Sequence, residues 1–413
     1  MKILNVILII LLLAGCQQTQ ESSEESSSSD SATDEYLAKA DSLAHAMIIT
    51  DGHVDLPYRL KESDFNPDED AEELLSAESG DFDYERARAG GLDAPFMSIY
   101  IPSSYQETGG AKELADSLID MVEGITELYP DRFALATSPA DVQKNFEEGK
   151  ISLPMGMENG APIGDDLSNV AYFHGRGIRY ITLTHAKNNL ICDSSYDTTR
   201  LWYGLSEFGQ DVVREMNRVG IMVDISHVSD STFYDVMELT DVPVIASHSS
   251  CRHFTPGFER NMSDDMIRRL GEENGVIQIN FGSTFLDAHA QEVQNEMRAY
   301  LRENQENMSD SARQAYIQNF LVENDFWTDV SKVADHIDRV VELAGIDHVG
   351  LGSDYDGVGD SLPEGLKDVS MFPNLIAELL RRGYSDEDIE KICYKNVFRV
   401  WQAVEDAAAE QAG

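Results

Sequence analysis

Short apolar runs alternate with amphipathic stretches along the chain from Tyr36 onward. Eight of these runs are typical of buried strands, because they are mainly apolar and end at turn-forming or polar residues. They cover residues 47–57, 96–101, 151–158, 179–185, 221–227, 242–249, 275–281 and 348–354. The stretches between them have helical spacing, most clearly Glu207–Val219 and Val330–Ala344. Strands that alternate with helices predict a parallel sheet, and eight such repeats predict an α/β fold of the (β/α)8 TIM-barrel type.

Two stretches exceed what a minimal barrel requires. Residues 61–80 are acidic and predict a loop after the first strand. Residues 282–330 are mostly polar with helical spacing, and predict a helical insertion between strands seven and eight. This pattern fits a lid over the barrel mouth and an inert decoration equally well. Residues 385–409 predict a helix that packs on the barrel exterior.

The first 16 residues are typical of an export signal. Lys2 precedes an apolar run over residues 3–14, which is too short to span a bilayer. The run ends in Leu13-Ala14-Gly15-Cys16, which resembles the lipobox of bacterial lipoproteins. We therefore expect cleavage before Cys16 and lipidation of its side chain, with an ordinary signal peptide as the alternative.

The next segment, residues 17–35, is rich in Ser and contains six acidic and no basic residues. Such a composition cannot form a core and predicts a disordered tether. The chain is thus divided into a signal peptide (1–16), a tether (17–35) and a hydrolase barrel (36–413). The expected location is the bacterial cell envelope, where a lipid anchor would hold the chain to a membrane on the periplasmic or outer side.

Charge and cysteine content narrow the function classes. The net charge of −44 argues against nucleic-acid binding, because phosphates would be repelled. It favours a solvated acidic surface over recruitment of a basic partner. Beyond Cys16 the chain has Cys192, Cys251 and Cys393, and none lies in a CxxC motif. This odd number predicts no disulfide framework, although the compartment would permit one bridge.

The carboxyl ends of the predicted strands carry the candidate chemistry. Six of the eight strands end in segments that contain His, Asp or Glu: residues 51–55, 157–160, 183–185, 224–227, 246–249 and 352–357. In a barrel these ends meet at one mouth. His53 and Asp55 are two residues apart, so both side chains face the same side of the strand. Imidazole and carboxylate are ligands that zinc accepts, and two metals that share a carboxylate would hold a hydroxide nucleophile.

The same segments resemble a known family. In their order and spacing, DGHVDLP, GMENG, YITLTH, VDISHVS, VIASHSS, ERN and GSDYDGV resemble the zinc membrane dipeptidases, the renal-dipeptidase type of the amidohydrolase superfamily. The resemblance runs from about residue 47 to about residue 400. It implies a binuclear metallopeptidase with two Zn²⁺ per chain, which hydrolyses dipeptides, L,D-dipeptides included, through a hydroxide that bridges the metals.

The resemblance also implies the metal ligands. His53 and Asp55 would bind the first zinc, and Glu158 would bridge both ions. His227 and His248 would complete the second site. Relatives commonly have Gly-Gly after the bridging Glu, whereas Asn159-Gly160 stands here, so we expect a reshaped pocket floor. Manganese or cobalt would also suit these ligands.

Three further roles follow from the resemblance. His185 would contact the substrate and stabilise the oxyanion of the tetrahedral intermediate. Arg260 would grip the C-terminal carboxylate of the substrate through its planar guanidinium, with a surface ion pair as the alternative. Asp354 would orient the hydroxide and carry its proton to the leaving amine, with Asp356 as a competitor. Asp224 either orients a ligand His or satisfies a backbone group.

Two rival functions remain open. Other amidohydrolases bridge their metals with a carboxylated Lys after strand four, and Lys187 offers that option, although Glu158 and the motifs favour a Glu bridge. The second rival is an inactive, surface-tethered binding protein, against which the retention of every ligand type argues. The expected partners are a dipeptide substrate and a membrane. The oligomeric state is left open, with a homodimer as one option.

Overall fold

The eight predicted strands form one parallel sheet. The computed structural model describes residues 35–304 and 308–412. The strand order is β1-β2-β5-β6-β7-β8-β9-β10. The bounds are β1 Thr50–Val54, β2 Ala94–Tyr100, β5 Met155–Glu158, β6 Ile178–Thr182, β7 Met222–Asp224, β8 Ile245–Ser249, β9 Val276–Ile279 and β10 Val349–Leu351. The two edges meet where Val54 bridges Tyr355 and the Asp55 amide donates to the Tyr355 carbonyl (2.9 Å). The predicted (β/α)8 architecture is therefore confirmed.

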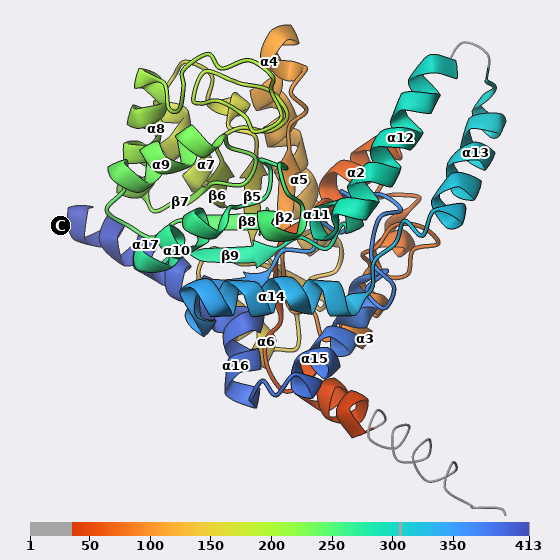
Figure 1. Ribbon diagram of the computed structural model, residues 1–413. Helices are drawn as coiled ribbons and strands as arrows, with labels where there is room; N and C mark the ends of the chain where they lie inside the picture. Colours follow the sequence, from red (N-terminus) through yellow and green to blue (C-terminus); the bar gives the residue numbers. More distant parts are fainter. Residues whose placement is uncertain (1–34, 305–307, 413) are drawn as a thin grey trace, which may run out of the picture.

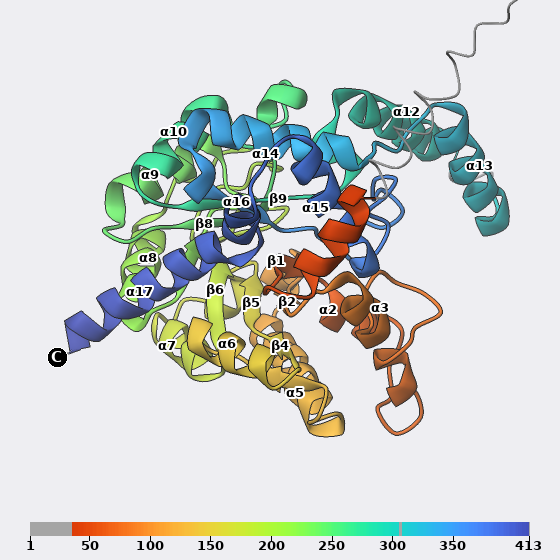
Figure 2. The same cartoon turned by 90° about the horizontal axis from the view of Figure 1, so that it is seen from below.

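Helices surround the sheet (Figures 1 and 2). They are a first helix over residues 35–44, α2 Leu56–Glu62, α3 Tyr84–Gly90, α4 Tyr105–Thr108, α5 Ala111–Leu128, α6 Pro139–Glu147, α7 Ser168–Gly175, α8 Glu207–Val219, α9 Asp230–Leu239, α10 Asp264–Glu272, α14 Val330–Ala344 and α15 Phe372–Arg381. Helices α8 and α14 have the predicted bounds. Several helices begin at a serine, as α8, α9 and α10 do at Ser206, Ser229 and Ser263, whose side chains accept from a first-turn amide.

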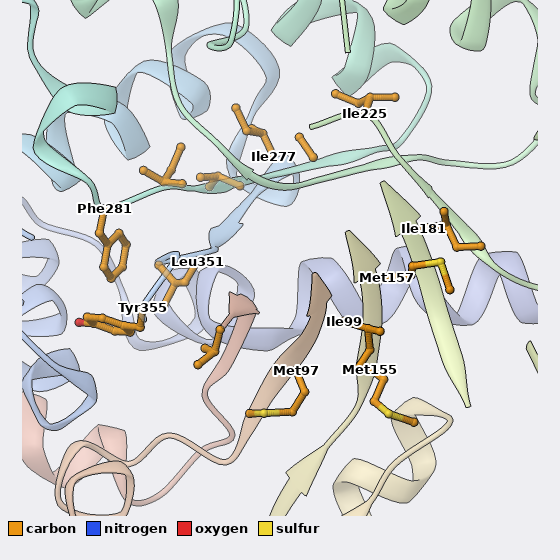
Figure 3. Packing of buried hydrophobic residues seen from close by; sticks show 14 of the residues in the cluster. Met97, Ile99, Met155, Met157, Ile181, Ile225, Ile277, Phe281, Leu351 and Tyr355 are labelled. Carbon is orange, nitrogen blue, oxygen red and sulfur yellow. The ribbon is translucent and has the colours of Figure 1, made fainter. Parts of the chain in front are cut away.

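Alternation along the strands separates the core from the site. On β2 and β5 the apolar side chains of Met97, Ile99, Met155 and Met157 belong to the main hydrophobic cluster, part of which is shown in Figure 3. Because successive strand residues point to opposite faces, Glu158 faces the other side of the sheet from Met157. Because the side chains alternate, one face of each strand packs against the helices, and the polar side chains on the other face point into the barrel.

The predicted third strand differs from the observed one. Residues 151–158 form two strands, β4 (Ile151–Leu153) and β5, which Pro154 separates. Strand β4 pairs with β3 (Phe133–Leu135) in a separate two-stranded sheet, and only β5 joins the barrel. Proline lacks the amide hydrogen that a central strand must donate, so the ladder changes partner there.

The predicted C-terminal helix is present, and the structure shows which part of the barrel it covers. It comprises α16 (Asp386–Glu390), a π-helical turn (Lys391–Lys395) and α17 (Asn396–Ala412). Trp401 is fully buried and packs against Phe96, which also contacts Tyr180. Residues near the starts of the strands complete this cluster. Helix α17 therefore packs on the outside of the barrel, as predicted, and covers its amino-terminal end (Figure 2).

The helical insertion between strands seven and eight is confirmed. It comprises α11 (Ser283–Leu286), α12 (Ala288–Asn304) and α13 (Asp310–Glu323). Helices α12 and α13 form a hairpin that extends away from the barrel in both views (Figures 1 and 2). Val293 and Leu321 give this hairpin a small core of its own. The acidic stretch 61–80 holds the last two residues of α2 and one short 3-10 helix (Ala71–Leu74), and is otherwise loop, as predicted.

Some predictions concern segments at the chain start. The signal peptide, the tether up to residue 34 and Cys16 lie outside the described residues. Within the described part, no helix has the length and apolar character needed to cross a membrane. Cys192, Cys251 and Cys393 are buried and unpaired there, which confirms the expected lack of a disulfide framework.

Candidate active site

The predicted site residues converge at the carboxyl end of the barrel. His53 lies in β1, Asp55 just after it, Glu158 at the end of β5, His185 after β6, His227 after β7, His248 in β8, Arg260 in the next loop and Asp354 after β10. All are buried except His185, whose side chain is 20% exposed. Most of them line a cavity of about 890 Å³. The strand-end prediction therefore placed these residues correctly.

The two oxygens of Glu158 face two different sets of ligand atoms. Its Oε2 lies 3.4 Å from His53 Nε2, which is 3.5 Å from Asp55 Oδ2. Its Oε1 lies 3.0 Å from His227 Nε2 and 3.3 Å from His248 Nε2. One carboxylate thus stands between a His–Asp pair and a His–His pair.

Hydrogen bonds behind the histidines orient two of these rings. His53 Nδ1 lies 2.8 Å from Tyr180 Oη, which donates to the Gly52 carbonyl. His248 Nδ1 lies 2.7 Å from Ser247 Oγ, which donates to Asp224 Oδ2 (2.6 Å). In each case the outer nitrogen carries the hydrogen, so the unprotonated Nε2 faces the centre of the site. Asp224 therefore helps to orient His248, and because its Oδ1 also accepts from the Ser226 and Ser247 amides, both of its predicted roles are present.

These residues fit a metal centre. His53 Nε2 and Asp55 Oδ1 are buried without a hydrogen-bond partner, and three overlapping groups of side chains bring ligand atoms within 4.8 Å of one another. Burial raises the pKa of Glu158, but its interactions with the neighbouring imidazoles, His53 and His185 first, lower it further, so the pKa lies well below its usual value. A buried carboxylate among converging lone pairs is the donor set that zinc and similar cations accept.

Asp354 is held in a constrained position beside these ligands. Its backbone is left-handed (φ 65°), which is uncommon for a residue other than glycine. Its Oδ2 accepts a hydrogen bond from Asn280 Nδ2 at 2.7 Å. Burial raises the pKa of Asp354 to about 7, with a further contribution from the charges of Asp55 and Glu158. A carboxyl with such a pKa can accept and release a proton near neutrality.

His185 presents an imidazole to the cavity. Its Nε2 lies 3.7 Å from Glu158 Oε1, and its own carbonyl accepts from Ser194 Oγ. Burial is the largest influence on His185 and lowers its pKa, with Arg260 adding to the effect. The ring is thus neutral at neutral pH and carries one donor, as a group that binds a developing oxyanion requires.

Arg260 is buried, so the surface ion pair considered above was wrong. Its Nη1 donates to Ser249 Oγ (2.6 Å) and its Nη2 to the His248 carbonyl (2.7 Å), while Nε has no partner. Its guanidinium carbon lies 5.3 Å from the centre of the Phe285 ring. Phe285 lines the cavity and Arg260 does not, so its grip on a substrate carboxylate stays a prediction.

The structure separates three alternatives. Asp356 pairs with Arg59 (Oδ2 to Nε, 3.0 Å) and accepts a hydrogen bond from the Asp81 amide. Its charge is thus balanced by an arginine, whereas Asp354 has no such ion-pair partner among the described residues. Lys187 is exposed, whereas Glu158 is buried within reach of His53, His227 and His248, so the structure favours Glu158 over Lys187. Asn159 has φ 79° and donates to the Ile101 carbonyl. It therefore supports the turn after Glu158 and does not line the cavity.

Sequence reasoning missed three supporting residues. Asn280 follows β9, so the strand-end rule would have found it had amides been counted with acids and histidines. Ser247 lies inside the VIASHSS segment, yet only its contact with His248 shows its role. Tyr180 begins the YITLTH segment, yet only its contact with His53, 127 positions away, shows its role.

The fold and the site together define a metal-dependent hydrolase on a (β/α)8 barrel. A family model described as "Membrane dipeptidase (Peptidase family M19)" matches residues 37–413. The chain therefore belongs to the membrane dipeptidase family, and its activity is that of a metal-dependent dipeptidase.

Individual relatives agree with this assignment. Dipeptidase tcpJ of Claviceps purpurea is 35% identical over 371 residues, which cover 88% of this chain and 78% of that protein. The crystal structure of the probable dipeptidase PvdM from Pseudomonas aeruginosa is similar with a TM-score of 0.77 and 26% identity, covering 91% of this chain and all of that one (100%). A metallopeptidase from Rhodobacter sphaeroides, liganded with a phosphinate mimic of L-Ala-D-Ala, has a TM-score of 0.71 and 26% identity over 87% of this chain and 99% of its own.

Proposed function

We propose that this chain is a two-zinc dipeptidase that accepts L,D-dipeptides as well as L,L-dipeptides. The observation that carries the metal count is the position of Glu158, whose Oε2 faces His53 and whose Oε1 faces His227 and His248. A carboxylate placed in this way would offer one oxygen to each of two cations. The mixed imidazole and carboxylate donors favour zinc, with manganese and cobalt as the other ions they would accept.

The protein ligands divide into two sets in this proposal. His53 and Asp55 would hold one ion, His227 and His248 the other, and Glu158 both. When bound, the ions supply polarisation of the scissile carbonyl and a water of lowered pKa. Tyr180 and Ser247 keep the ligand nitrogens unprotonated toward the centre.

The remaining residues would handle protons and charge. Asp354 accepts the proton of the attacking water and delivers it to the departing amine, a task that suits a carboxyl with a pKa of about 7. His185 donates a hydrogen bond to the oxygen that becomes negative in the transition state. Arg260 fixes the C-terminal carboxylate through the part of its guanidinium that Ser249 and His248 leave free.

The proposal of L,D-dipeptides as substrates rests on a relative. The Rhodobacter sphaeroides metallopeptidase is liganded with a mimic of L-Ala-D-Ala, and it is 26% identical to this chain. The cavity of about 890 Å³ is large compared with a dipeptide and leaves room for either configuration.

One paired experiment tests the function. Metal content of the folded domain is measured together with release of amino acids from L,L-, L,D- and N-acetylated dipeptides. About two zinc per chain and cleavage of free L,L- and L,D-dipeptides, but not of N-acyl amino acids, is the expected result. One metal per chain would contradict the two-zinc assignment. Two metals per chain without cleavage of dipeptides would indicate that the substrate belongs to another class of amides.

We also propose that Cys16 carries a lipid that anchors the enzyme to a membrane of the cell envelope. The supporting observation is the Leu13-Ala14-Gly15-Cys16 segment after a short apolar run. The full-length protein should partition with membranes, and mass spectrometry should find an acylated Cys16 at the mature N-terminus. Release of a Cys16→Ser variant into the soluble fraction is expected. An unmodified wild-type protein that is equally soluble would contradict the anchor.

A further inference from the structure

The inserted hairpin supplies one wall of the active-site cavity. Gln291, Gln294, Asn295 and Arg298, all on α12, line the cavity that also contains Glu158 and the other site residues. Helix α12 is held in place at its first turn, where Gln291 Nε2 donates to the Thr284 carbonyl (2.8 Å). The insertion is therefore part of the substrate site, which excludes the inert decoration considered above.

Charge is distributed unevenly around this cavity. Asp55, Asp354 and Asp356 lie on one side, on the loops after β1 and β10. Among the described residues that line the cavity, Arg298 is the one Lys or Arg. A cationic group of a ligand is therefore attracted to the acidic wall, and an additional anionic group to the α12 wall.

Arg298 has unused hydrogen-bond donors. Its side chain is exposed and forms no ion pair or hydrogen bond within residues 35–304 and 308–412. Arg339 and Arg382, by contrast, each pair with acidic side chains. A free guanidinium at the mouth of a cavity is well suited to bind a carboxylate of a ligand.

More cationic groups stand just beyond Arg298. A neighbouring cavity of about 460 Å³ lies between α12 and α13, shares Asn295 and Arg298 with the first, and is also lined by Arg302 and Arg313. The Nε atom of Arg313 is buried without a hydrogen-bond partner. An anionic group that reaches out of the catalytic cavity on this side therefore meets arginines, and none of the described residues that line the neighbouring cavity is acidic.

Phe285 relates this wall to the carboxylate end of the substrate. Phe285 lines the cavity and lies on α11, directly before α12. The guanidinium carbon of Arg260 lies 5.3 Å from the centre of the Phe285 ring. The wall that carries Arg298 thus continues from the residue that packs against Arg260, the residue proposed for the C-terminal carboxylate.

We propose that Arg298 selects dipeptides whose C-terminal residue carries an acidic side chain. This inference rests on the proposed dipeptidase function. The backbone carboxylate would go to Arg260 and the side-chain carboxylate to Arg298, with Gln294 and Asn295 as neutral hydrogen-bond partners beside it. Ion pairs at partly exposed positions are modest in strength, so the expected preference over an uncharged isostere is about fivefold in kcat/KM.

The test compares substrates that differ by one charge. The values of kcat/KM for Ala-Glu and Ala-Gln, with the second residue in both L and D forms, are measured for the zinc-loaded wild type and for Arg298→Gln. The wild type should prefer the Glu substrate by about fivefold through a lower KM, and Arg298→Gln should remove this preference while Ala-Gln changes less than about twofold. Arg218→Gln on α8 makes the same charge change at an exposed residue paired with Glu215, and should keep the preference.

The other outcomes are distinct. Equal kcat/KM for the Glu and Gln substrates in the wild type would overturn the proposal, as would a preference that survives Arg298→Gln or is lost in Arg218→Gln. Glu-Ala and Gln-Ala form the second substrate pair. A Glu preference that appears only in this pair would overturn the assignment to the C-terminal residue. If none of these dipeptides is cleaved, the dipeptidase function itself is contradicted. This outcome can be told apart from a loss of preference, in which all of them are still cleaved.

Discussion

Asn280 Nδ2 donates a hydrogen bond to Asp354 Oδ2 at 2.7 Å, and so joins the ends of β9 and β10 beside the metal ligands. Asn280 is fully buried, and its Oδ1 accepts from the Gly282 amide. One amide thus fixes the carboxyl proposed to move the proton. The bond holds Asp354 beside His53 and Asp55, and the three side chains bring ligand atoms within 4.8 Å of one another.

Replacement of Asn280 by Leu should reduce kcat about tenfold, because a buried hydrogen bond to a catalytic carboxyl contributes on the order of 1.4 kcal/mol. Zinc content should not change, since Asn280 contacts none of the proposed ligands. Steady-state kinetics and metal analysis measure both. Asn217→Leu removes a buried amide on α8 that bonds to Thr240, and should leave kcat unaltered. Loss of zinc from Asn280→Leu would show that the residue supports the metal site and not Asp354.

Asp354→Asn should retain zinc and lose activity by roughly 10²- to 10⁴-fold, the usual contribution of a general acid–base group. The amide has nearly the same shape but cannot carry the proton. Metal content and kcat are measured on the same preparation. If zinc and activity fall in equal proportion, Asp354 acts as a ligand and the proton-transfer role is excluded.

Tyr180→Phe should weaken zinc binding by about 10- to 100-fold, as is typical when the partner of a ligand histidine is removed. The ring stays in the core, and only the contacts of Oη with His53 Nδ1 and with the Gly52 carbonyl are lost. Competition with a chelator gives the apparent zinc affinity. Tyr172→Phe, which removes an exposed hydroxyl bonded to Asp116, is the matched control. Unchanged affinity in Tyr180→Phe would mean that other contacts orient His53.

Acid should destabilise the fold through His336, which lies outside the motifs. Its Nδ1 accepts from the Cys251 amide, its Nε2 donates to the Leu286 carbonyl, and burial lowers its pKa from 6.5 to about 4. The unfolded state therefore binds the proton first. The stabilising effect of the neutral ring is complete above pH 6.5 and declines as the pH falls toward 4.

Urea unfolding measures this effect. Between pH 8 and pH 5 the contribution of His336 to the free energy of unfolding should fall by about 2 kcal/mol. His336→Gln removes the titrating group, so its stability should depend less steeply on pH than that of the wild type. Other histidines titrate in both proteins and cancel in the comparison. Equal pH dependence in the two proteins would contradict a neutral buried His336.

Most of the architecture was predictable because it rests on local patterns. Apolar runs at β-strand length and amphipathic stretches such as α8 determine which residues are buried, and burial of one face requires no knowledge of distant contacts. The strand-end positions of His53, Glu158 and His227 followed from the same pattern, since all strands of a parallel barrel end at one mouth.

The sequence by itself thus determined the barrel, the mouth at which the site lies and the types of its ligands. Only the tertiary structure showed that Tyr180 orients His53, that α17 closes the far end of the barrel and that Arg298 faces the cavity. The physical reason is the same in each case. These contacts join residues from separate strands and helices, and they depend on strand register, barrel closure and side-chain direction, none of which a local pattern of apolar and polar residues encodes.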